Sequence, residues 1–448
     1  MGNETDLIGS VLELDDIQSG VLRPRPAPYA AAYVLFRIDE SKAGRELMRR
    51  IRPVVASAAH PASPAGDTWV SIALSFQGLK ALRVPQATLY SFPLEFQQGM
   101  AARAAILGDT GESGPEHWEK PLGSPDVHIV LTALAPDAER LEAALTRARQ
   151  EYQKIAGITT IWSQDCHALP SQREAFGFKD GISHPAIEGS GIPGTNLHER
   201  PLKPGEFVLG YPDEMGDVPA IPKPDILGRN GSYVAFRKLH QRVAAFRQFL
   251  KANSSGSEGQ ELLAAKMMGR WRSGAPFALC PLHDDPELGA DPLRNNVFLF
   301  KDDDAIGYHT PCGSHIRRMN PRDSDVAGVV RIHRMIRRGT SYGPPLPDGV
   351  LEDDGLERGL MFAFVGANLA RQFEFVQSQW MNDGSFFGGG AAKDPVAGAN
   401  SAADAYIFPR RPLPIRVKGL SRFVVTRGGE YCFLPGLRAL QWLGELES

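Results

Sequence analysis

The sequence predicts an α+β fold in which helices cover antiparallel sheets. In the first 170 residues, apolar runs rich in β-branched residues alternate with stretches whose apolar positions repeat about every 3.6 residues. The segments follow the order strand, helix, strand, a long insertion, and then strand, helix, strand, which is typical of a ferredoxin-like sheet with helices on one face. A second series of similar segments follows, so we expect two versions of one plan in the 448 residues.

The predicted elements of the first half are short and well separated. The run "YAAAYVLFRI" carries one charge in ten residues and is typical of a buried strand, and "SKAGRELMRRIRPVVASA" has the spacing of an amphipathic helix. A second helical pattern stops before Gly157. We expect strands at 29–38, 69–75, 126–134 and 158–163, and helices at 41–58 and 138–155.

The second half begins with a Pro/Gly-rich stretch at 188–228, and long structured loops of this kind are often functional. Beyond it we expect strands at 232–239, 359–367 and 422–427, helices at 240–252, 259–271 and 368–382, and a closing segment at 430–440. We therefore predict an N-terminal domain at 1–170 and a C-terminal domain at 171–448.

The composition, 42% hydrophobic and 23% charged, is that of an ordinary globular protein. The net charge of −3 gives no reason to expect nucleic acid or an anionic membrane as partner. No apolar run approaches the ~18 residues of a membrane-spanning helix, and neither a basic region with an apolar stretch nor a twin arginine opens the chain. The four cysteines form no C-x-x-C pair, so we expect buried thiols in a reducing compartment and a cytoplasmic location.

Several common site motifs are missing. The glycine clusters at 108–114 and 388–390 do not follow the spacing of a dinucleotide fingerprint or a P-loop, so we interpret them as loops. The chain also lacks the H-E-x-x-H of zincins and the G-x-S-x-G of α/β-hydrolases.

Three other segments carry candidate chemistry. In "FGFKDGISHP" (176–185), Asp180 stands among glycines and apolar residues, where it could cap a turn, hold a metal or move a proton. In "CGSHIRRMNPR" (312–322), His315 precedes several arginines, which disfavour its protonated form and keep a ring nitrogen free for a metal; a basic surface turn explains the pattern equally well. In "RIHRMIRRGTSYG" (331–343), Arg337 is either part of a solvated helix face or a permanent cation in a pocket.

Together these residues are the minimal parts for splitting a peroxide on haem iron. Iron takes a histidine on one side. The other side needs a group that moves a proton and a cation that favours the departing hydroxide. Residues 180, 315 and 337 meet this requirement only if the fold brings them together.

The same segments resemble the dye-decolorizing peroxidases, a family of haem enzymes. Gly177-Phe178-Lys179-Asp180-Gly181 matches the G-x-x-D-G motif of the family, "GSHIRRMNPR" matches its axial-histidine segment, and "IRRGTSYG" matches its distal-arginine segment. Similar stretches continue along nearly the whole chain, among them "GEFVLGYPDE", "NGSYVAFRKL", "QFEFVQSQWMND" and "EYCFLPGLRAL". The resemblance is closest to the longer, non-secreted subgroups. It implies two ferredoxin-like domains with haem in the C-terminal one.

The resemblance also implies roles for individual residues. His315 would be the proximal iron ligand, Asp180 the distal acid–base residue and Arg337 the distal cation. Arg318 would pair with a haem propionate, and Gly181 would let the backbone approach the haem without a Cβ. The remaining candidates are Glu374 as the carboxylate that orients His315, Phe362 and Phe364 as distal-wall or ordinary core residues, and Trp380 and Tyr342 as aromatics that carry electrons to the surface. His184 stands where the family commonly has an amide, and its role is left open.

The implied reaction reduces hydrogen peroxide and oxidises dyes or phenolic and other aromatic donors in one-electron steps. The implied cofactor is one haem b per chain, and a homo-oligomer is possible. Two other readings are a haem-binding or haem-handling protein with incidental peroxidase activity and a chlorite-dismutase-like enzyme, which shares the ferredoxin-like plan but is disfavoured by the G-x-x-D-G loop. A non-haem α+β protein is the last alternative.

Overall fold

The computed structural model describes residues 11–59, 68–194, 196, 198–324, 328–385 and 392–447. The glycine cluster at 388–390 and the first ten residues, which entered the interpretation above, lie outside these ranges. Within the described ranges, no helix combines the length and the apolar character needed to cross a bilayer.

The first half forms a four-stranded antiparallel sheet in the order β4-β1-β3-β2. This is the ferredoxin-like order that the sequence predicts. The predicted strands are all present, and the last one is longer than expected. Their bounds are β1 (Ala30–Ile38), β2 (Trp69–Ser75), β3 (Ile129–Ala135) and β4 (Ile158–His167).

The second half repeats the same order with β11-β5-β8-β6, and β7 also pairs with β8. The two short strands β6 and β7 lie in the arginine-rich segment, where the sequence offered only a helix face or a pocket. A separate two-stranded sheet joins β9 to β10. The bounds are β5 (Ser232–Gln241), β6 (Ile336–Arg337), β7 (Thr340–Tyr342), β8 (Gly359–Gly366), β9 (Asp404–Phe408), β10 (Ile415–Leu420) and β11 (Val424–Leu434).

The two halves share one sheet. Strands β2 and β11 pair at Leu74–Phe433 and Ser75–Cys432, and β4 and β7 contact each other at the opposite ends. The sheet thus curls into a barrel whose interior contains apolar side chains from both halves. The division at residues 170 and 171 falls just after β4 and stays a prediction.

Strand β1 shows why its sequence is almost continuously apolar. Side chains alternate across a strand, and both faces of β1 are buried. Ala31, Tyr33 and Leu35 belong to the barrel interior. Val34 and Phe36 belong to the core on the outer face, beneath the helices.

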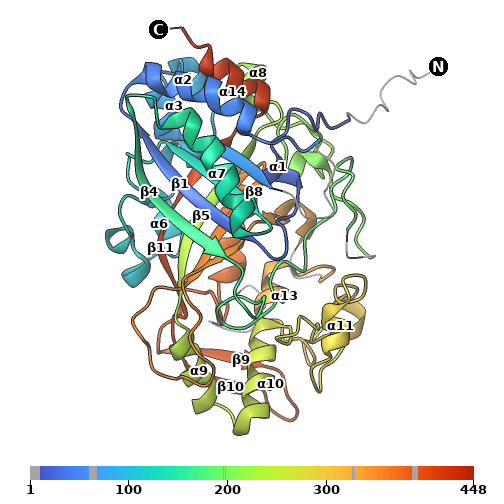
Figure 1. Cartoon of the computed structure of the whole chain (residues 1–448). Helices are drawn as coiled ribbons and strands as arrows, with labels where there is room; N and C mark the ends of the chain where they lie inside the picture. The colour runs from blue at the N-terminus through green and yellow to red at the C-terminus, as the bar shows by residue number, and fades with distance from the viewer. Residues whose placement is uncertain are drawn as a thin grey trace, which may run out of the picture.

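Helices cover the outer face of the first half (Figure 1). α2 and α7 pack on this face, and α14 lies beside α2. α2 ends at Ile51, earlier than predicted, because Pro53 cannot continue the helix. The bounds are α2 (Ser41–Ile51), α7 (Ala138–Tyr152) and α14 (Leu437–Gly444).

The main helices of the second half lie elsewhere. α9 and α10 pack with β9 and β10 in a separate apolar cluster, at the far end of the molecule from α2 and α14 (Figure 1). The predicted helix at 368–382 consists of two π-helical segments that follow β8. The bounds are α9 (Val243–Ala252), α10 (Gly256–Met268), η8 (Leu369–Glu374) and η9 (Val376–Met381).

The remaining helices are single turns or little more, and most lie in the insertions between strands. The bounds are α1 (Ser19–Leu22), α3 (Phe76–Ala81), α4 (Gln86–Leu89), α5 (Leu94–Gln98), α6 (Ala104–Leu107), α8 (Asp225–Gly228), α11 (Pro286–Ala290), α12 (Lys301–Asp304) and α13 (His315–Met319).

Candidate active site

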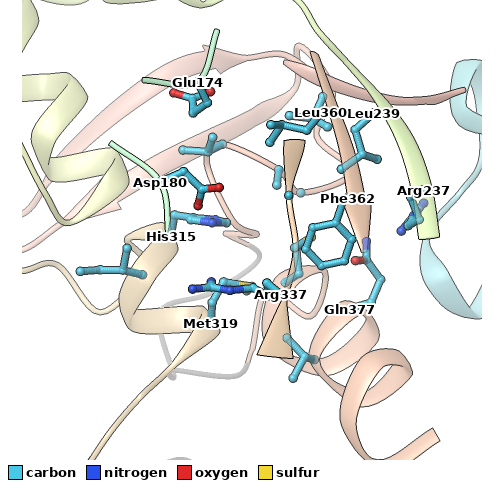
Figure 2. A pocket seen from close by; sticks show the side chains of 18 of the residues that line it. Glu174, Asp180, Arg237, Leu239, His315, Met319, Arg337, Leu360, Phe362 and Gln377 are labelled. Atoms are coloured by element: carbon cyan, nitrogen blue, oxygen red, sulfur yellow. The ribbon is translucent and has the colours of Figure 1, made fainter. Parts of the chain in front are cut away.

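A cavity of about 270 Å³ lies beside the outer face of β5 and β8 in the second half. Leu239 of β5 and Leu360 and Phe362 of β8 supply apolar walls, and Met319 of α13 lies across from them (Figure 2). Asp180, His315 and Arg337, which are far apart in the sequence, all line this one cavity. The fold therefore meets the condition on which the three-residue interpretation depended.

His315 is the first residue of α13, and a carboxylate next to its Nδ1 holds the ring in place. Its Nδ1 lies 2.8 Å from Oδ2 of Asp394. The other oxygen of that carboxylate accepts from the backbone N–H groups of Val396 and Ala397. Asp394 is fully buried; burial alone would raise its pKa, but His315 and these donors keep that pKa below its usual value. An ionised carboxylate only accepts, so Nδ1–H of His315 donates and Nε2 keeps its lone pair for a metal.

The prediction that Glu374 orients His315 is therefore corrected to Asp394. Glu374 forms an ion pair with Arg103 and accepts from the hydroxyl of Tyr431. The sequence contains one hint of the true partner, because the Asp-Pro pair at 394–395 is a turn signal. That signal predicts the turn but not a contact with a histidine 79 residues away.

Asp180 projects from the loop between β4 and β5, and its side chain is 39% exposed. Its Oδ2 lies 3.7 Å from an Nη of Arg25, a residue of the N-terminal half that the sequence did not single out. On another side the carboxylate lies against Gly339, where a Cβ would come within 3.3 Å of Oδ2. Asp180 is thus a partly exposed carboxylate with one cation near it.

The glycines around Asp180 serve the shape of the loop. Gly177 and Gly181 have φ values of +93° and +80°, a region that favours glycine. A Cβ on Gly177 would also collide with Arg272, whose guanidinium donates to the carbonyl of Phe176. Gly181 does line the cavity, as a cofactor-contacting residue should.

A partly buried carboxylate anchors the same loop. Glu174 accepts from the backbone N–H groups of Phe176 and Phe178 and from the amide of Gln241 on β5. Burial raises its pKa above the usual value. Glu174 thereby ties the segment that carries Asp180 to the sheet that carries the apolar walls.

Arg337 is directed into the cavity by the two-residue strand β6. This strand pairs with β8, with Arg337 opposite Phe364. Its neighbour Ile336 is buried in the barrel interior, and alternation along a strand sends Arg337 to the other face. Among the described residues, its guanidinium forms no hydrogen bond or ion pair. Arg337 is a cation without a protein partner there, and not part of a solvated helix face.

Arg318 does not line the cavity, and its predicted role as a propionate partner is corrected. Its guanidinium donates to the backbone carbonyls of Trp380, Asp383 and Ala392. The side chain is almost fully buried, and burial lowers its pKa. Arg318 thus holds the end of η9 and the backbone at Asp383 and Ala392 in place.

The two aromatics proposed to carry electrons are not at the surface. Trp380 is fully buried and packs against the rings of His333 and Phe375. Tyr342 is 2% exposed, and its hydroxyl donates to the carbonyl of Leu239. Neither can contact a bulky donor directly, so the prediction of surface positions is wrong.

Of three further candidate residues, one lines the cavity and two do not. Phe362 lines the cavity, whereas Phe364 is fully buried in the outer core, 5.7 Å from the ring of Phe373. His184 does not line the cavity, and its buried Nδ1 has no hydrogen-bond partner among the described residues. Burial and then the nearby arginines, first Arg338, hold its pKa well below the usual value, so the ring is neutral.

The cavity suits a flat apolar cofactor that carries negative groups. Arg270 and Arg322 line it, and neither forms an ion pair with a described residue. Burial lowers the pKa of each to about 9. Both guanidinium groups donate to neutral oxygens, those of backbone carbonyls and of the Asn296 side chain, and not to a carboxylate. Haem carries two propionates and an iron that accepts an imidazole, so these arginines, the apolar walls and Nε2 of His315 fit that group.

The comparisons with known proteins agree with this fit. Residues 16–166 match the family model described as the DyP dimeric alpha+beta barrel domain. The chain is 34% identical to "Peroxidase 2" of Mycetinis scorodonius, over 96% of this chain and 87% of that protein. It is 32% identical to a "Dye-decolorizing peroxidase" of Exidia glandulosa, with the same two coverages.

Solved structures extend the likeness to three dimensions. A dye-decolorizing peroxidase in complex with 2,6-dimethoxyphenol superposes with a TM-score of 0.83 at 28% identity, over 97% of this chain and all of that one. The chain thus belongs to the dye-decolorizing peroxidases, haem-dependent oxidoreductases that act on peroxide.

Proposed function

We propose that the chain binds one haem b and reduces hydrogen peroxide with electrons from phenolic or other aromatic donors. The observation that supports this most is that His315, Asp180 and Arg337 line a single cavity. When bound, haem supplies an iron that binds peroxide and accepts its oxidising equivalents. The protein supplies a fixed imidazole, a proton carrier and a cation.

The proposed roles follow from the chemistry of each group. His315 would hold the cofactor through Nε2, and the hydrogen bond to Asp394 fixes the tautomer of the His315 imidazole. Asp180 would take a proton from one peroxide oxygen at its carboxylate and give it to the other, which would leave as water with two electrons that the bound haem would supply. Arg337, which has no described protein partner, stabilises the negative charge on that leaving oxygen. Two one-electron donors and two protons complete the reduction of one peroxide to two waters.

The choice of haem b rests on the cysteines. Covalent attachment in c-type haem uses a C-x-x-C-H motif, which this chain lacks. None of its four cysteines lines the cavity, and all four are free thiols. A haem held by His315 and by contacts with the walls therefore needs no covalent bond, and the pyridine haemochromogen spectrum distinguishes the two forms.

The proposed donors are small phenols. The solved relative with 2,6-dimethoxyphenol supports this class. The buried positions of Trp380 and Tyr342 favour donors that reach the cavity rim over donors that stay at the surface. A role for either aromatic as an internal electron carrier stays a prediction.

The deciding experiment is an absorption spectrum of the haem-loaded protein before and after one equivalent of hydrogen peroxide. We expect a rapid change of the haem bands, followed by return to the starting spectrum when 2,6-dimethoxyphenol is added. His315→Ala should lose haem or change the spectrum of the resting protein. A preparation that takes up no haemin would contradict the proposal.

A haem-handling protein with incidental peroxidase activity is the second candidate, since a haem pocket alone needs only His315 and apolar walls. It predicts slow reaction with peroxide and no dependence of that rate on Asp180 or Arg337. The guanidinium of Arg337 has no hydrogen-bond or ion-pair partner among the residues that the structure describes. This favours the enzyme, because a pocket that only stores haem does not need that cation.

Finer assignments also stay predictions. The free thiols are compatible with the cytoplasmic location and non-secreted subgroup that the sequence suggests. A homo-oligomer is tested by light scattering of the haem-loaded protein.

A further inference from the structure

We propose that Arg25, a residue of the N-terminal half, is a positioning residue that holds the carboxylate of Asp180 for proton transfer. The inference rests on the proposed function and adds a second cation to the site. Its starting observation is the approach of an Nη of Arg25 to Oδ2 of Asp180 at 3.7 Å. No other ion pair involves Asp180 among the residues that the structure describes.

The side chain of Arg25 is held in place from the N-terminal half. It is only 17% exposed, and its guanidinium lies 4.3 Å from the centre of the Tyr29 ring, which is within the range of a cation–π contact. The hydroxyl of Tyr29 accepts from the backbone N–H of Ser341 on β7. Arg25 therefore rests on a ring that is itself fixed to the segment carrying Arg337. A guanidinium supported in this way loses little further freedom when it holds a carboxylate.

The carboxylate of Asp180 is confined on two sides. Arg25 lies on one side, and the backbone at Gly339 lies on another, where a Cβ would come within 3.3 Å of Oδ2. The neighbouring Gly181 also faces Arg25, since a Cβ there would lie 3.6 Å from the same guanidinium. Asp180 sits on a loop and is 39% exposed, so this confinement is what limits its side-chain rotation.

Arg25 and Arg337 have different roles in this proposal. If Asp180 were paired with Arg337, the cation needed by the leaving oxygen would be engaged by a carboxylate. The pair with Arg25 satisfies Asp180 and leaves the guanidinium of Arg337 to the cavity. Arg25 thus acts through Asp180 and does not need to touch peroxide.

Other charged or titratable groups surround Asp180. Glu174 on the same loop interacts with it electrostatically, Arg337 lines the same cavity, and His184 lies beyond Gly181. His184 is neutral near neutral pH because burial and the arginines lower its pKa. Within the described part of the chain, Arg25 is the cation in direct contact with Asp180.

The test compares the second-order rate of reaction with peroxide in haem-loaded variants. Arg25→Gln should slow the reaction about tenfold at unchanged haem content, since a misplacement of ~1 Å can cost ~10²-fold. Arg25→Lys keeps a positive charge next to the carboxylate and should restore most of the rate.

A matched control comes from the same segment. Arg23 donates to the carbonyl of Ala58 and does not line the cavity. Arg23→Gln should lower thermal stability at most and leave the rate unchanged. An equal change in Arg23→Gln and Arg25→Gln would mean that the segment matters only as structure, and it would overturn the assignment.

A double-mutant cycle separates this inference from the function on which it rests. In an Asp180→Asn background, Arg25→Gln should have no further effect on rate, because Arg25 acts through Asp180. Additive losses would overturn the role of Arg25. If Asp180→Asn is slow but Arg25→Gln behaves as wild type, the inference about Arg25 fails and the proposed function stands. If wild type itself does not react with peroxide, the proposed function fails.

Discussion

The two halves of the chain have the same strand order but use the outer face of the sheet differently. In the first half, α2 and α7 cover that face and fill it with apolar side chains. In the second half, α9 and α10 pack against β9 and β10 instead, and the face of β5 and β8 borders a cavity. The same strand order therefore gives a closed apolar core where helices pack on the outer face of the sheet. It gives a cavity where the helices pack elsewhere.

Strand β5 contains the change within its own length. Tyr233 and Ala235 point into the outer apolar core. Arg237, Leu239 and Gln241, which share their face by alternation, line the cavity. One strand thus contributes side chains both to the apolar core and to the cavity. Substitutions in the core and in the cavity test this difference.

The largest expected effect lies in the second half. Asp180→Asn should lower the rate of reaction with peroxide by about 10²- to 10⁴-fold, because the group that moves the proton is lost. Haem content should not change. Stopped-flow absorbance measures the rate, and Asp165→Asn on the exposed edge of β4 is the control from the first half. Equal rates in Asp180→Asn and wild type would remove the functional contrast between the halves.

The next effect should appear as stability in the first half. Phe36 is buried beneath the helices, and its ring lies 4.7 Å from that of Tyr152. Phe36→Ala should lower the free energy of unfolding by about 3–5 kcal/mol. Phe362→Ala removes a similar ring from a cavity wall and should lower the free energy of unfolding by much less. Urea denaturation of the haem-loaded proteins gives both values, and a greater loss in Phe362→Ala would reverse the comparison.

A smaller effect is expected where the second half fixes its histidine. Asp394→Asn should weaken haem affinity by about 10- to 100-fold, because an amide holds the His315 tautomer less firmly than a carboxylate. Haemin titration measures the affinity. Asp404→Asn on β9, which loses an ion pair with Lys393, is the matched control. Unchanged affinity in Asp394→Asn would mean that the carboxylate is not needed to orient the ligand.

The smallest expected effect is on the pH dependence of stability, at a contact between the two halves. Glu430 of β11 accepts from the backbone N–H of Met100, and burial raises its pKa to about 7. Since the unfolded carboxyl titrates near 4.5, the folded state holds its proton more tightly, and stability should fall as the pH rises from about 4.5 to 7. Glu430→Gln should remove most of this dependence. Thermal unfolding across that range measures it, with Glu139→Gln on exposed α7 as the control; identical slopes in both variants would contradict the assignment.

Much of the fold could be predicted because its strands are local patterns. The run at 29–38 predicts β1 from its own composition, and the same holds for β2, β5 and β8. Strands β6 and β7 were missed because they are two and three residues long and lie among arginines. Their register comes from pairing with β8 and from burial of Ile336, neither of which is visible in a short window.

The site divides in the same way. Asp180, His315 and Arg337 could be named because each lies in a segment with a distinctive composition, and the resemblance to the family placed them in order. Asp394 and Arg25 could not, because their importance lies in contacts with residues 79 and 155 positions away along the chain. Burial of Trp380 and Tyr342 and the carbonyl contacts of Arg318 also depend on packing between distant segments.

The closure of the barrel decides how far this site can be transplanted. Ile336 sits among side chains of the first half inside the barrel, and the residue after it is Arg337. A fragment beginning near residue 171 would lose that surrounding wall, together with Arg25. The cofactor pocket is consequently not a portable module: grafting it onto another scaffold requires the N-terminal strands that never touch the cavity.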